Sequence, residues 1–225
     1  SIMTALRFPS GLYGVTPEWD DTHRLLRAVR LAAAGGMRAL QLRRKNLPEA
    51  ALAAQARALA PLCRELGVVF LINDHWRLAL DIGADGVHLG RDDADPIQVR
   101  KEAGADLLIG VSCYNELDRA QLLLAAEPDY LAFGAVFPSP TKPQAVHAPL
   151  SLLTQASDLV TGCNLPRPTV VAIGGITPDN IAQVIEAGAD CAAVITSLFE
   201  THDIAAAAHA CAAAFLPEPD PDSGP

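Results

Sequence analysis

Short apolar runs rich in β-branched residues alternate along the chain with longer alanine- and leucine-rich stretches in which apolar residues recur at helical spacing. Most of the short runs are continuously apolar, as expected for parallel strands that are covered on both faces. The pattern predicts eight strands, over Leu12–Val15, Ala39–Arg43, Val68–Asn73, Gly86–Leu89, Leu107–Ser112, Tyr130–Val136, Thr169–Gly174 and Cys191–Thr196. It also predicts helices near residues 18–34, 48–66, 76–82, 95–103, 115–126, 149–159, 178–187 and 203–215.

A weak internal repeat supports this arrangement. The tripeptide Gly-Ala-Asp recurs at residues 83–85, 104–106 and 188–190, each time between a predicted helix and the next strand, where glycine supplies the left-handed residue after a helix end. Eight strand-then-helix units predict an α/β fold, a single TIM (β/α)8 barrel. An open doubly wound sheet would carry a G-x-G-x-x-G turn after the first strand, whereas Gly14-Val15-Thr16-Pro17 stands there.

The length of 225 residues fits one large domain of this type. We expect an N-terminal segment over residues 1–10, the catalytic barrel over residues 11–216 and a disordered tail over residues 217–225.

Composition narrows the class of partner. A formal net charge of −9 gives no basic surface for a nucleic acid, although a local cluster of cations could still hold a phosphate. The 5 cysteines form no C-x-x-C pair, and no apolar stretch is long enough to span a membrane. The sequence therefore predicts a cytoplasmic protein that acts on small molecules, without nucleic-acid or membrane partners, and it is compatible with a homo-oligomer.

Polar residues follow seven of the eight predicted strands, at the end where TIM barrels carry their chemistry. Gln41, Arg43 and Lys45 share one side of an extended segment because side chains alternate along a strand. Taken alone, this segment is read first as a solvated strand end. The alternative is a cationic face that points toward the barrel axis and binds an anion.

Carboxylates follow two neighbouring strands. Asn73-Asp74 and Asp92-Asp93 could converge on a hard cation such as Mg²⁺, which prefers oxygen ligands and bridges to phosphate. Asn and Asp are also common turn and helix-cap residues, and spacing alone does not separate the two readings. His88 lies inside a short strand and is read as a core histidine bonded to a carbonyl.

The last two loops favour a phosphate site. Gly174-Gly175-Ile176-Thr177-Pro178 combines small residues with an expected N-cap threonine and a proline at the first helical position. Bare amides at a helix start bind phosphate, and Thr196-Ser197 follows the eighth strand. The rim therefore predicts two unequal anion sites, one assisted by a metal and rich in cations, the other built from backbone amides.

These residues resemble a known family, thiamine-phosphate synthase, also called thiamine-phosphate pyrophosphorylase, over nearly the whole chain. The resemblance implies a condensation of two substrates. One is 4-amino-2-methyl-5-(diphosphooxymethyl)pyrimidine, here called the pyrimidine diphosphate. The other is 4-methyl-5-(2-phosphoethyl)thiazole or its carboxylate, here called the thiazole phosphate. The products are thiamine phosphate and pyrophosphate. The motifs that carry the resemblance are Gln41-Leu42-Arg43-Arg44-Lys45, Ile72-Asn73-Asp74, residues 86–93, Gly110-Val111-Ser112, residues 137–142 and Ala172-Ile173-Gly174-Gly175-Ile176.

The resemblance also implies roles for individual residues. The pyrimidine diphosphate would be held by Gln41, Arg43, Lys45 and Asn73, and Mg²⁺ by Asp74 and Asp93. Ser112 and Lys142 would act beside the departing pyrophosphate, with Arg43, in a dissociative displacement assisted by Mg²⁺. The residues implied for the thiazole phosphate are Ser139, Thr141, Gly174, Gly175, Ile195 and Thr196.

Four positions depart from the family pattern. Ser139 stands where threonine is common, which keeps a hydroxyl. Arg91-Asp92-Asp93 replaces the usual Gln-Glu-Asp, and Tyr114 replaces a frequent histidine.

Two further functions remain in competition with the synthase. One is the thiazole tautomerase, a metal-free paralogue with the same barrel in which the cationic and Asp motifs are degraded and a histidine occupies the position of Tyr114. The other is a catalytically silent barrel that binds a phosphorylated metabolite. A phosphosugar epimerase rests on fold analogy alone.

Overall fold

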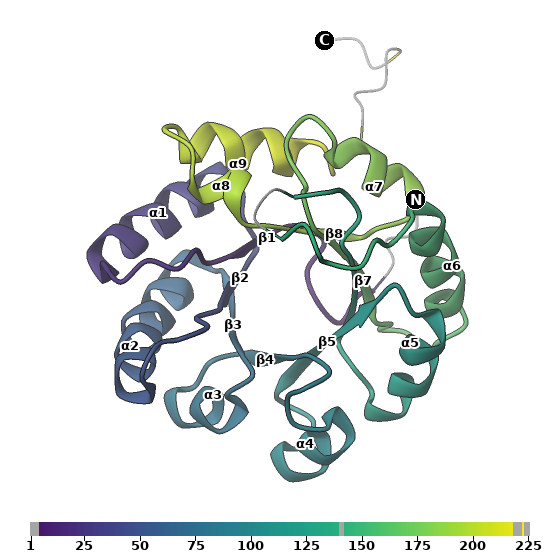
Figure 1. The fold of residues 1–225 in the computed structure, drawn as a ribbon, viewed down its shortest axis with the longest axis horizontal. Coiled ribbons are helices and arrows are strands. Elements are labelled where there is room, and N and C mark those ends of the chain that lie inside the picture. Colours follow the sequence, from purple (N-terminus) through teal and green to yellow (C-terminus); the bar gives the residue numbers. More distant parts are fainter. Residues whose placement is uncertain (1–4, 140–141, 218–221, 223–225) are drawn as a thin grey trace.

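The computed structural model describes residues 5–139, 142–217 and 222, and it shows eight parallel strands that close into a barrel in chain order, β1 to β8. Figure 1 shows the helices arranged around this barrel, which confirms the predicted TIM barrel. The strands are β1 (Gly11–Val15), β2 (Ala39–Leu42), β3 (Val69–Asn73), β4 (Gly86–Leu89), β5 (Leu108–Tyr114), β6 (Tyr130–Phe133), β7 (Thr169–Ile173) and β8 (Cys191–Val194). The helices are α1 (Thr22–Gly35), α2 (Glu49–Leu66), α3 (Trp76–Ile82), α4 (Pro96–Ala103), α5 (Leu117–Leu123), the 3₁₀ turn η1 (Leu124–Ala126), α6 (Leu150–Thr161), α7 (Ile181–Ala187), α8 (Thr196–Phe199) and α9 (Ile204–Ala213).

Several helix boundaries differ from the predicted ones for local reasons. Helix α1 begins at Thr22 rather than at residue 18, because the side chain of Asp21 accepts a hydrogen bond from the amide of Arg24 and caps the helix there. Strand β8 ends at Val194, and the next residues form the short helix α8, which the sequence analysis did not predict.

Apolar side chains form two layers. The larger layer lies between the outer face of the sheet and the helices, which explains why most strands read as continuous apolar runs. The smaller layer fills the barrel interior and includes Phe8, Tyr13, Tyr130, Val171 and Cys191. The sheet is therefore buried on both faces, as the sequence pattern predicts.

One end of the barrel is closed by aromatic side chains. The ring of Phe8 lies 5.0 Å from that of Tyr13 and 4.7 Å from that of Tyr130, and all three are only 1% exposed. The backbone of Phe8 is held by Thr169, whose hydroxyl donates to the Phe8 carbonyl at 2.6 Å.

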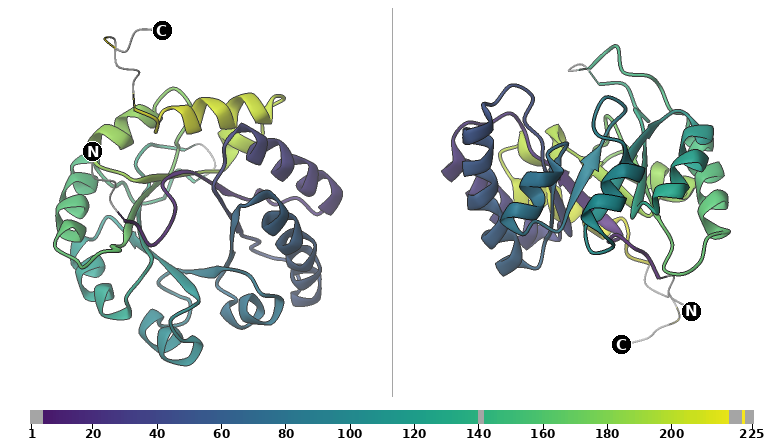
Figure 2. Two further views of the ribbon diagram at one scale, coloured as in Figure 1. Left: turned by 180° about the vertical axis from the view of Figure 1, so that it is seen from behind. Right: turned by 90° about the horizontal axis from the view of Figure 1, so that it is seen from below.

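Figure 2 shows that the loop after β6 projects from the barrel. No helix among the described residues is long and apolar enough to cross a membrane.

The substitution Gly110→Ala tests how tightly this interior is packed. A Cβ atom on Gly110 would lie 1.9 Å from Cζ of Tyr130, whose ring cannot retreat because Phe8 and Tyr13 pack against it. We expect the free energy of unfolding to fall by about 3 kcal/mol or more, measured by urea denaturation. Gly162→Ala is the matched control, because Gly162 has φ −78° and its nearest contact to an added Cβ is at 3.5 Å. Equal stabilities of the two variants would contradict the packing described here.

Candidate active site

Two adjoining cavities open at the carboxyl ends of the strands. The larger has a volume of about 490 Å³ and the smaller about 320 Å³. Because Lys142 and Gly174 line both, the two cavities meet at the loops after β6 and β7. Of the residues that the sequence singles out, the larger cavity is lined by Gln41, Arg43, Asn73, His88, Arg91, Asp92, Asp93, Ser112, Tyr114, Lys142, Gly174 and Ile195. The smaller is lined by Ser139, Lys142, Gly174, Gly175, Ile195 and Thr196.

Three of the predicted site residues are not among these lining residues. Lys45 is exposed beside the larger cavity, close enough for its charge to act on Lys142. Asp74 lies next to Asp93 at the end of β3. Thr141 falls outside the described residues.

Positive charge collects on one side of the larger cavity. Among the described residues, neither Arg43 nor Lys45 nor Lys142 forms an ion pair. Burial, together with the positive charges of Arg43 and Lys45, lowers the pKa of Lys142 to about 8. Cations that repel one another at the mouth of a cavity favour the binding of a multiply charged anion there.

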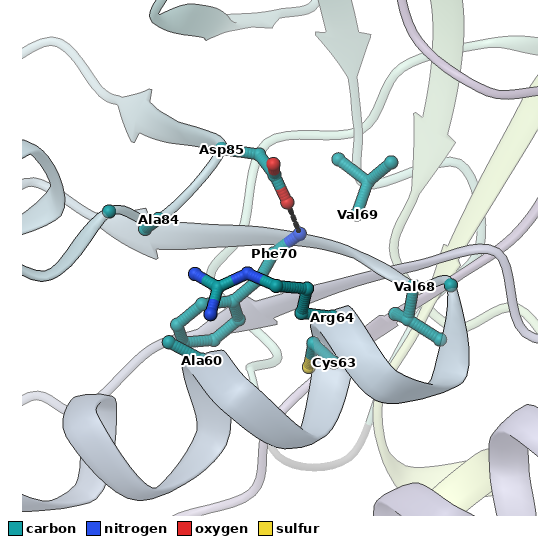
Figure 3. Close-up of a pocket in the computed structure, with 10 residues that line it drawn as sticks. Ala60, Cys63, Arg64, Val68, Val69, Phe70, Ala84 and Asp85 are labelled. Carbon is teal, nitrogen blue, oxygen red and sulfur yellow. Dashed lines mark hydrogen bonds between the residues drawn. The ribbon is translucent and has the colours of Figure 1, made fainter.

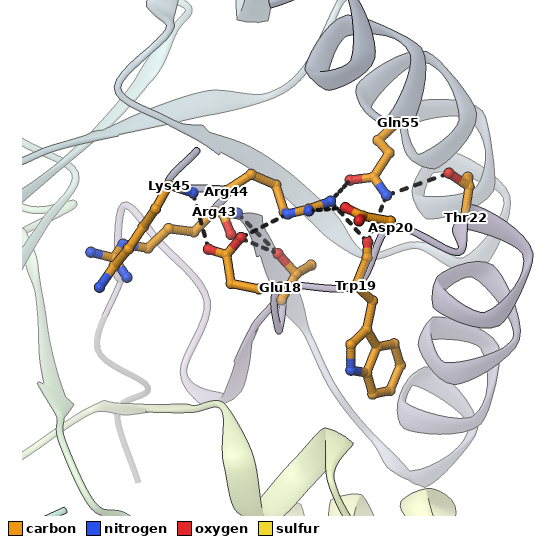
Figure 4. Close-up of polar contacts among 9 residues, drawn as sticks. Glu18, Trp19, Asp20, Thr22, Arg43, Arg44, Lys45 and Gln55 are labelled. Carbon is orange, nitrogen blue, oxygen red and sulfur yellow. Dashed lines mark hydrogen bonds and ion pairs between the residues drawn. The ribbon is translucent and has the colours of Figure 1, made fainter. Parts of the chain in front are cut away.

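Arg44, the middle residue of the same motif, points away from the cavity (Figure 4). Its guanidinium donates to the Trp19 carbonyl and to Oε1 of Gln55, both at 2.8 Å, and pairs with Glu18 and Asp20. Glu18 also accepts a hydrogen bond from the amide of Lys45 at 3.0 Å. Arg44 therefore fastens the loop after β1 to the end of β2 and fixes the backbone that carries its two neighbouring cations, Arg43 and Lys45.

Two carboxylates, Asp74 and Asp93, lie close together in the segments that follow β3 and β4. Oδ2 of Asp93 accepts a hydrogen bond from the amide of Gly90 at 2.7 Å, which fixes its direction. Burial raises the pKa of Asp74, and the nearby negative charge of Asp93 raises it further. Among the described residues no cluster of three or more His, Cys, Asp or Glu side chains could hold a metal. A pair of facing carboxylates nevertheless fits Mg²⁺, which binds through one or two carboxylates and completes its shell with water and phosphate oxygens.

A row of hydrogen bonds crosses the barrel interior below the larger cavity. Nε2 of Gln41 donates to the Tyr13 hydroxyl at 3.0 Å, and the hydroxyls of Tyr13 and Tyr130 are 2.9 Å apart. The ring of His88 contacts the Tyr130 hydroxyl through Nδ1 at 2.5 Å and the Ser112 hydroxyl through Nε2 at 2.7 Å. The expectation that His88 bonds to a carbonyl is wrong, because its partners are two hydroxyls. Burial lowers the pKa of His88 to about 4.

One atom of this row has no partner. Oε1 of Gln41 is buried and accepts no hydrogen bond from any described residue, although Gln41 lines the larger cavity. A buried, unpaired amide oxygen costs free energy, so it indicates a position for a ligand donor. Gln41 is predicted from the sequence, whereas Tyr13 and Tyr130 are not, because tyrosines within apolar runs have the pattern of ordinary core residues.

The loop after β7 differs in part from its prediction. Gly174 and Gly175 have φ values of 106° and 63°, and a Cβ on Gly175 would lie 2.8 Å from the Phe137 carbonyl oxygen. These glycines are therefore needed for the close approach of the loops after β6 and β7. Helix α7 begins at Ile181 rather than at Pro178, and the amide of Thr177 donates to Oδ1 of Asn180 at 2.8 Å. That amide is thus engaged within the loop.

The two unusual residues at the rim contact each other. The hydroxyl of Tyr114 accepts a hydrogen bond from the amide of Arg91 at 3.0 Å, and the guanidinium of Arg91 lies 5.0 Å above the Tyr114 ring. Arg91 also pairs with Glu116. Tyr114 and Arg91 therefore hold the start of the loop that carries Asp93.

Another cavity, of about 230 Å³, lies between α2 and the amino ends of β3 and β4 (Figure 3). Its carboxylate, Asp85, already accepts a hydrogen bond from the amide of Phe70 at 2.8 Å. None of the predicted site residues lines it. The described residues that the sequence predicts for the site gather instead at the carboxyl ends of the strands.

The fold and this rim define a barrel suited to phosphorylated small molecules, with a carboxylate pair and cations that form no ion pair among the described residues. The model of a family described as thiamine monophosphate synthase matches residues 12–198. The chain is 72% identical over 217 residues to the thiamine-phosphate synthase of Bordetella pertussis, covering 96% of this chain and 100% of that protein. It is 51% identical over 205 residues to the one of Chromobacterium violaceum, covering 91% and 96%.

Solved structures agree with these relatives. The thiamine phosphate pyrophosphorylase from Pyrococcus furiosus superimposes with a TM-score of 0.78 at 33% identity, covering 93% of this chain and 96% of that one. The chain belongs to the thiamine monophosphate synthase family, which confirms the resemblance seen in the sequence.

Replacing Arg44 tests its structural role. Arg44→Met leaves Oε1 of Gln55 without its donor and removes one of the two donors to the Trp19 carbonyl, so we expect the free energy of unfolding to fall by about 2 kcal/mol in urea denaturation. The control is Arg30→Met, which removes an ion pair to Glu65 whose side chains are 55% and 63% exposed, and should change stability by less than about 0.5 kcal/mol. A loss no larger than that of the control would show that Arg44 is not a clamp.

Proposed function

We propose that this enzyme joins the pyrimidine diphosphate to the thiazole phosphate and releases thiamine phosphate and pyrophosphate. Family membership supports the reaction, and the two adjoining cavities offer a place for each substrate. The 5 cysteines are all free and 4 of them are buried, which supports a reducing compartment such as the cytoplasm.

The larger cavity is assigned to the pyrimidine diphosphate. Arg43, Lys45 and Lys142 would neutralise the diphosphate, and Asn73 and Ser112 would add hydrogen bonds from the ends of β3 and β5. The buried Oε1 of Gln41 needs a donor, and the exocyclic amino group of the pyrimidine supplies one. The same cavity would thus bind both the charged diphosphate and the neutral pyrimidine ring of this substrate.

Asp74 and Asp93 would hold Mg²⁺ against the diphosphate. Their donor set is hard oxygen, and their mutual repulsion is relieved by a cation between them. When bound, the ion supplies neutralisation of charge on the leaving pyrophosphate. Arg43, Lys45 and Lys142 would neutralise the rest of the charge on the diphosphate.

The reaction then needs no nucleophilic side chain. The bond between the methylene carbon and the diphosphate oxygen breaks, and its electron pair leaves with the pyrophosphate. The electron-rich aminopyrimidine supports the cation that remains on the methylene carbon, and the thiazole nitrogen forms the new bond with its lone pair. Lys142, Arg43 and Ser112 stabilise the departing oxygens, and the barrel holds the thiazole beside the cation.

The smaller cavity is assigned to the thiazole phosphate. Ser139 and Thr196 offer hydroxyls, Gly174 and Gly175 offer close approach of the backbone, and Ile195 offers an apolar surface. Thr141 stays a predicted contact from the sequence. The loops after β7 and β8 are the usual position of phosphate in TIM barrels.

The observation that carries the proposal is the pair of adjoining cavities that share Lys142, of which only the larger is also lined by Arg43 and by the carboxylate of Asp93. The test supplies the purified protein with both substrates, with and without Mg²⁺, and follows thiamine phosphate and pyrophosphate together. The proposal requires equimolar products that depend on the metal. Binding of the thiazole phosphate without any product would instead favour the tautomerase or the silent metabolite-binding barrel.

The carboxylate pair generates one prediction. In Asp93→Asn we expect the Mg²⁺ concentration for half-maximal activity to rise by at least about tenfold, because one anionic oxygen ligand is lost. Direct titration of the protein and pyrophosphate with Mg²⁺ should show the same loss of affinity. Asp92→Asn removes the neighbouring carboxylate, which also lines the larger cavity but is exposed and not assigned to the metal, and should shift this concentration by less than about twofold. The reverse order of effects would exclude Asp93 as the ligand.

Lys142 generates a second prediction. Because its pKa is about 8 in the free enzyme, the cation is lost as the pH rises through that value. We expect kcat/KM for the pyrimidine diphosphate to decline above about pH 8, since this parameter reports groups of the free enzyme. Lys142→Arg, with a guanidinium that stays charged, should retain its own kcat/KM to higher pH. Identical pH profiles would remove Lys142 from the anion site.

A further inference from the structure

The hydrogen-bonded row below the larger cavity has its two ends in that cavity. It runs from Gln41 through Tyr13, Tyr130 and His88 to Ser112, and Gln41, Ser112 and also His88 line the cavity wall. These residues come from β1, β2, β4, β5 and β6, so the row crosses the barrel interior rather than following one strand.

The number of protons on each group determines which partner is the donor in every hydrogen bond of the row. Nε2 of Gln41 donates to the Tyr13 hydroxyl, so the single proton of Tyr13 is directed to Tyr130. The proton of Tyr130 is then directed to Nδ1 of His88, which must accept. A neutral ring that accepts at Nδ1 carries its proton on Nε2, and that N–H donates to Oγ of Ser112. The Ser112 proton is left to point into the cavity.

We propose that Tyr13, Tyr130 and His88 are positioning residues that form one directional hydrogen-bond relay. The relay makes Gln41 present an acceptor to the cavity and, at the same time, makes Ser112 present a donor. The inference rests on the proposed function for the identity of the two groups that are recognised, the pyrimidine amino group and an oxygen of the diphosphate.

The direction matches the needs of that substrate. An amino group requires an acceptor, which is Oε1 of Gln41, and an anionic oxygen requires a donor, which is the hydroxyl of Ser112. If every bond of the relay ran the other way, Gln41 would turn its NH₂ toward the amino group and Ser112 would turn a lone pair toward the anion. Both contacts would then be repulsive.

The surroundings keep the relay in place. The rings of His88 and Tyr130 are stacked with centroids 5.6 Å apart and planes inclined by 23°. Phe8 packs below both tyrosines, whose pKa values burial raises, so that each hydroxyl keeps its single proton. Hydroxyls held this firmly between neighbours have little freedom to reverse.

The tautomer of His88 tests the direction without any substrate. In protein labelled with ¹⁵N-histidine, long-range proton–nitrogen correlation distinguishes a ring protonated on Nε2 from one protonated on Nδ1, and His88→Gln assigns the signal. We expect a neutral ring with its proton on Nε2. A proton on Nδ1, or on both nitrogens, at neutral pH overturns the proposal.

Kinetics test what the relay does. Tyr13→Phe removes the hydroxyl that fixes the Gln41 amide, so we expect the KM for the pyrimidine diphosphate to rise by roughly tenfold, while the KM for the thiazole phosphate stays within about twofold. Thr169→Val is the matched control, because it also removes a buried hydroxyl from the barrel interior, but one bonded to the Phe8 backbone and outside the relay. Equal kinetics of the two variants overturns the proposal.

The two measurements separate this inference from the proposed function. If Tyr13→Phe does not fold, the tautomer in the unmodified protein still decides the direction of the relay. If the unmodified protein makes no thiamine phosphate, the proposed function fails, whereas a proton on Nε2 of His88 would still support the relay itself.

Discussion

Closure of the parallel barrel is the constraint on which the rest of the molecule depends. Because all eight strands run the same way and β1 pairs with β8, every strand delivers its following loop to one rim. Residues as distant in sequence as Arg43 and Lys142 then line one cavity. Toward the opposite end, Phe8 and the two buried tyrosines fill the interior below the cavity.

Charge at the rim is arranged so that an anion completes it. The cations near Lys142 have no ion-pair partners among the described residues, and their mutual repulsion helps to lower the pKa of that lysine. The carboxylates of Asp74 and Asp93 also repel each other, which helps to raise the pKa of Asp74. A diphosphate together with a divalent cation would relieve both. The guanidinium of Arg44 donates hydrogen bonds to Glu18, Asp20 and Gln55. The side chains of its neighbours Arg43 and Lys45 do not take part in these bonds and can bind a ligand.

The sequence predicts the strands and the rim because both follow from local rules: buried parallel strands are continuously apolar, and barrels keep polar residues at the strand ends. Features set by distant partners were missed or misread. Arg44 belongs to a cationic motif, yet its partner Asp20 lies 24 positions away. Tyr13 finds Tyr130 at a separation of 117 residues, which no local pattern reveals. The start of α7 was misplaced because the side chain of Asn180 takes the Thr177 amide.

The central claim is that the rim holds two separate anion sites that meet at Lys142. Calorimetric titration with thiazole phosphate, performed with the protein alone and with the protein saturated with inorganic pyrophosphate and Mg²⁺, tests it most directly. Separate sites predict that one molecule of thiazole phosphate binds per chain in both titrations. Displacement of thiazole phosphate by pyrophosphate would mean a single shared anion site and would contradict the account.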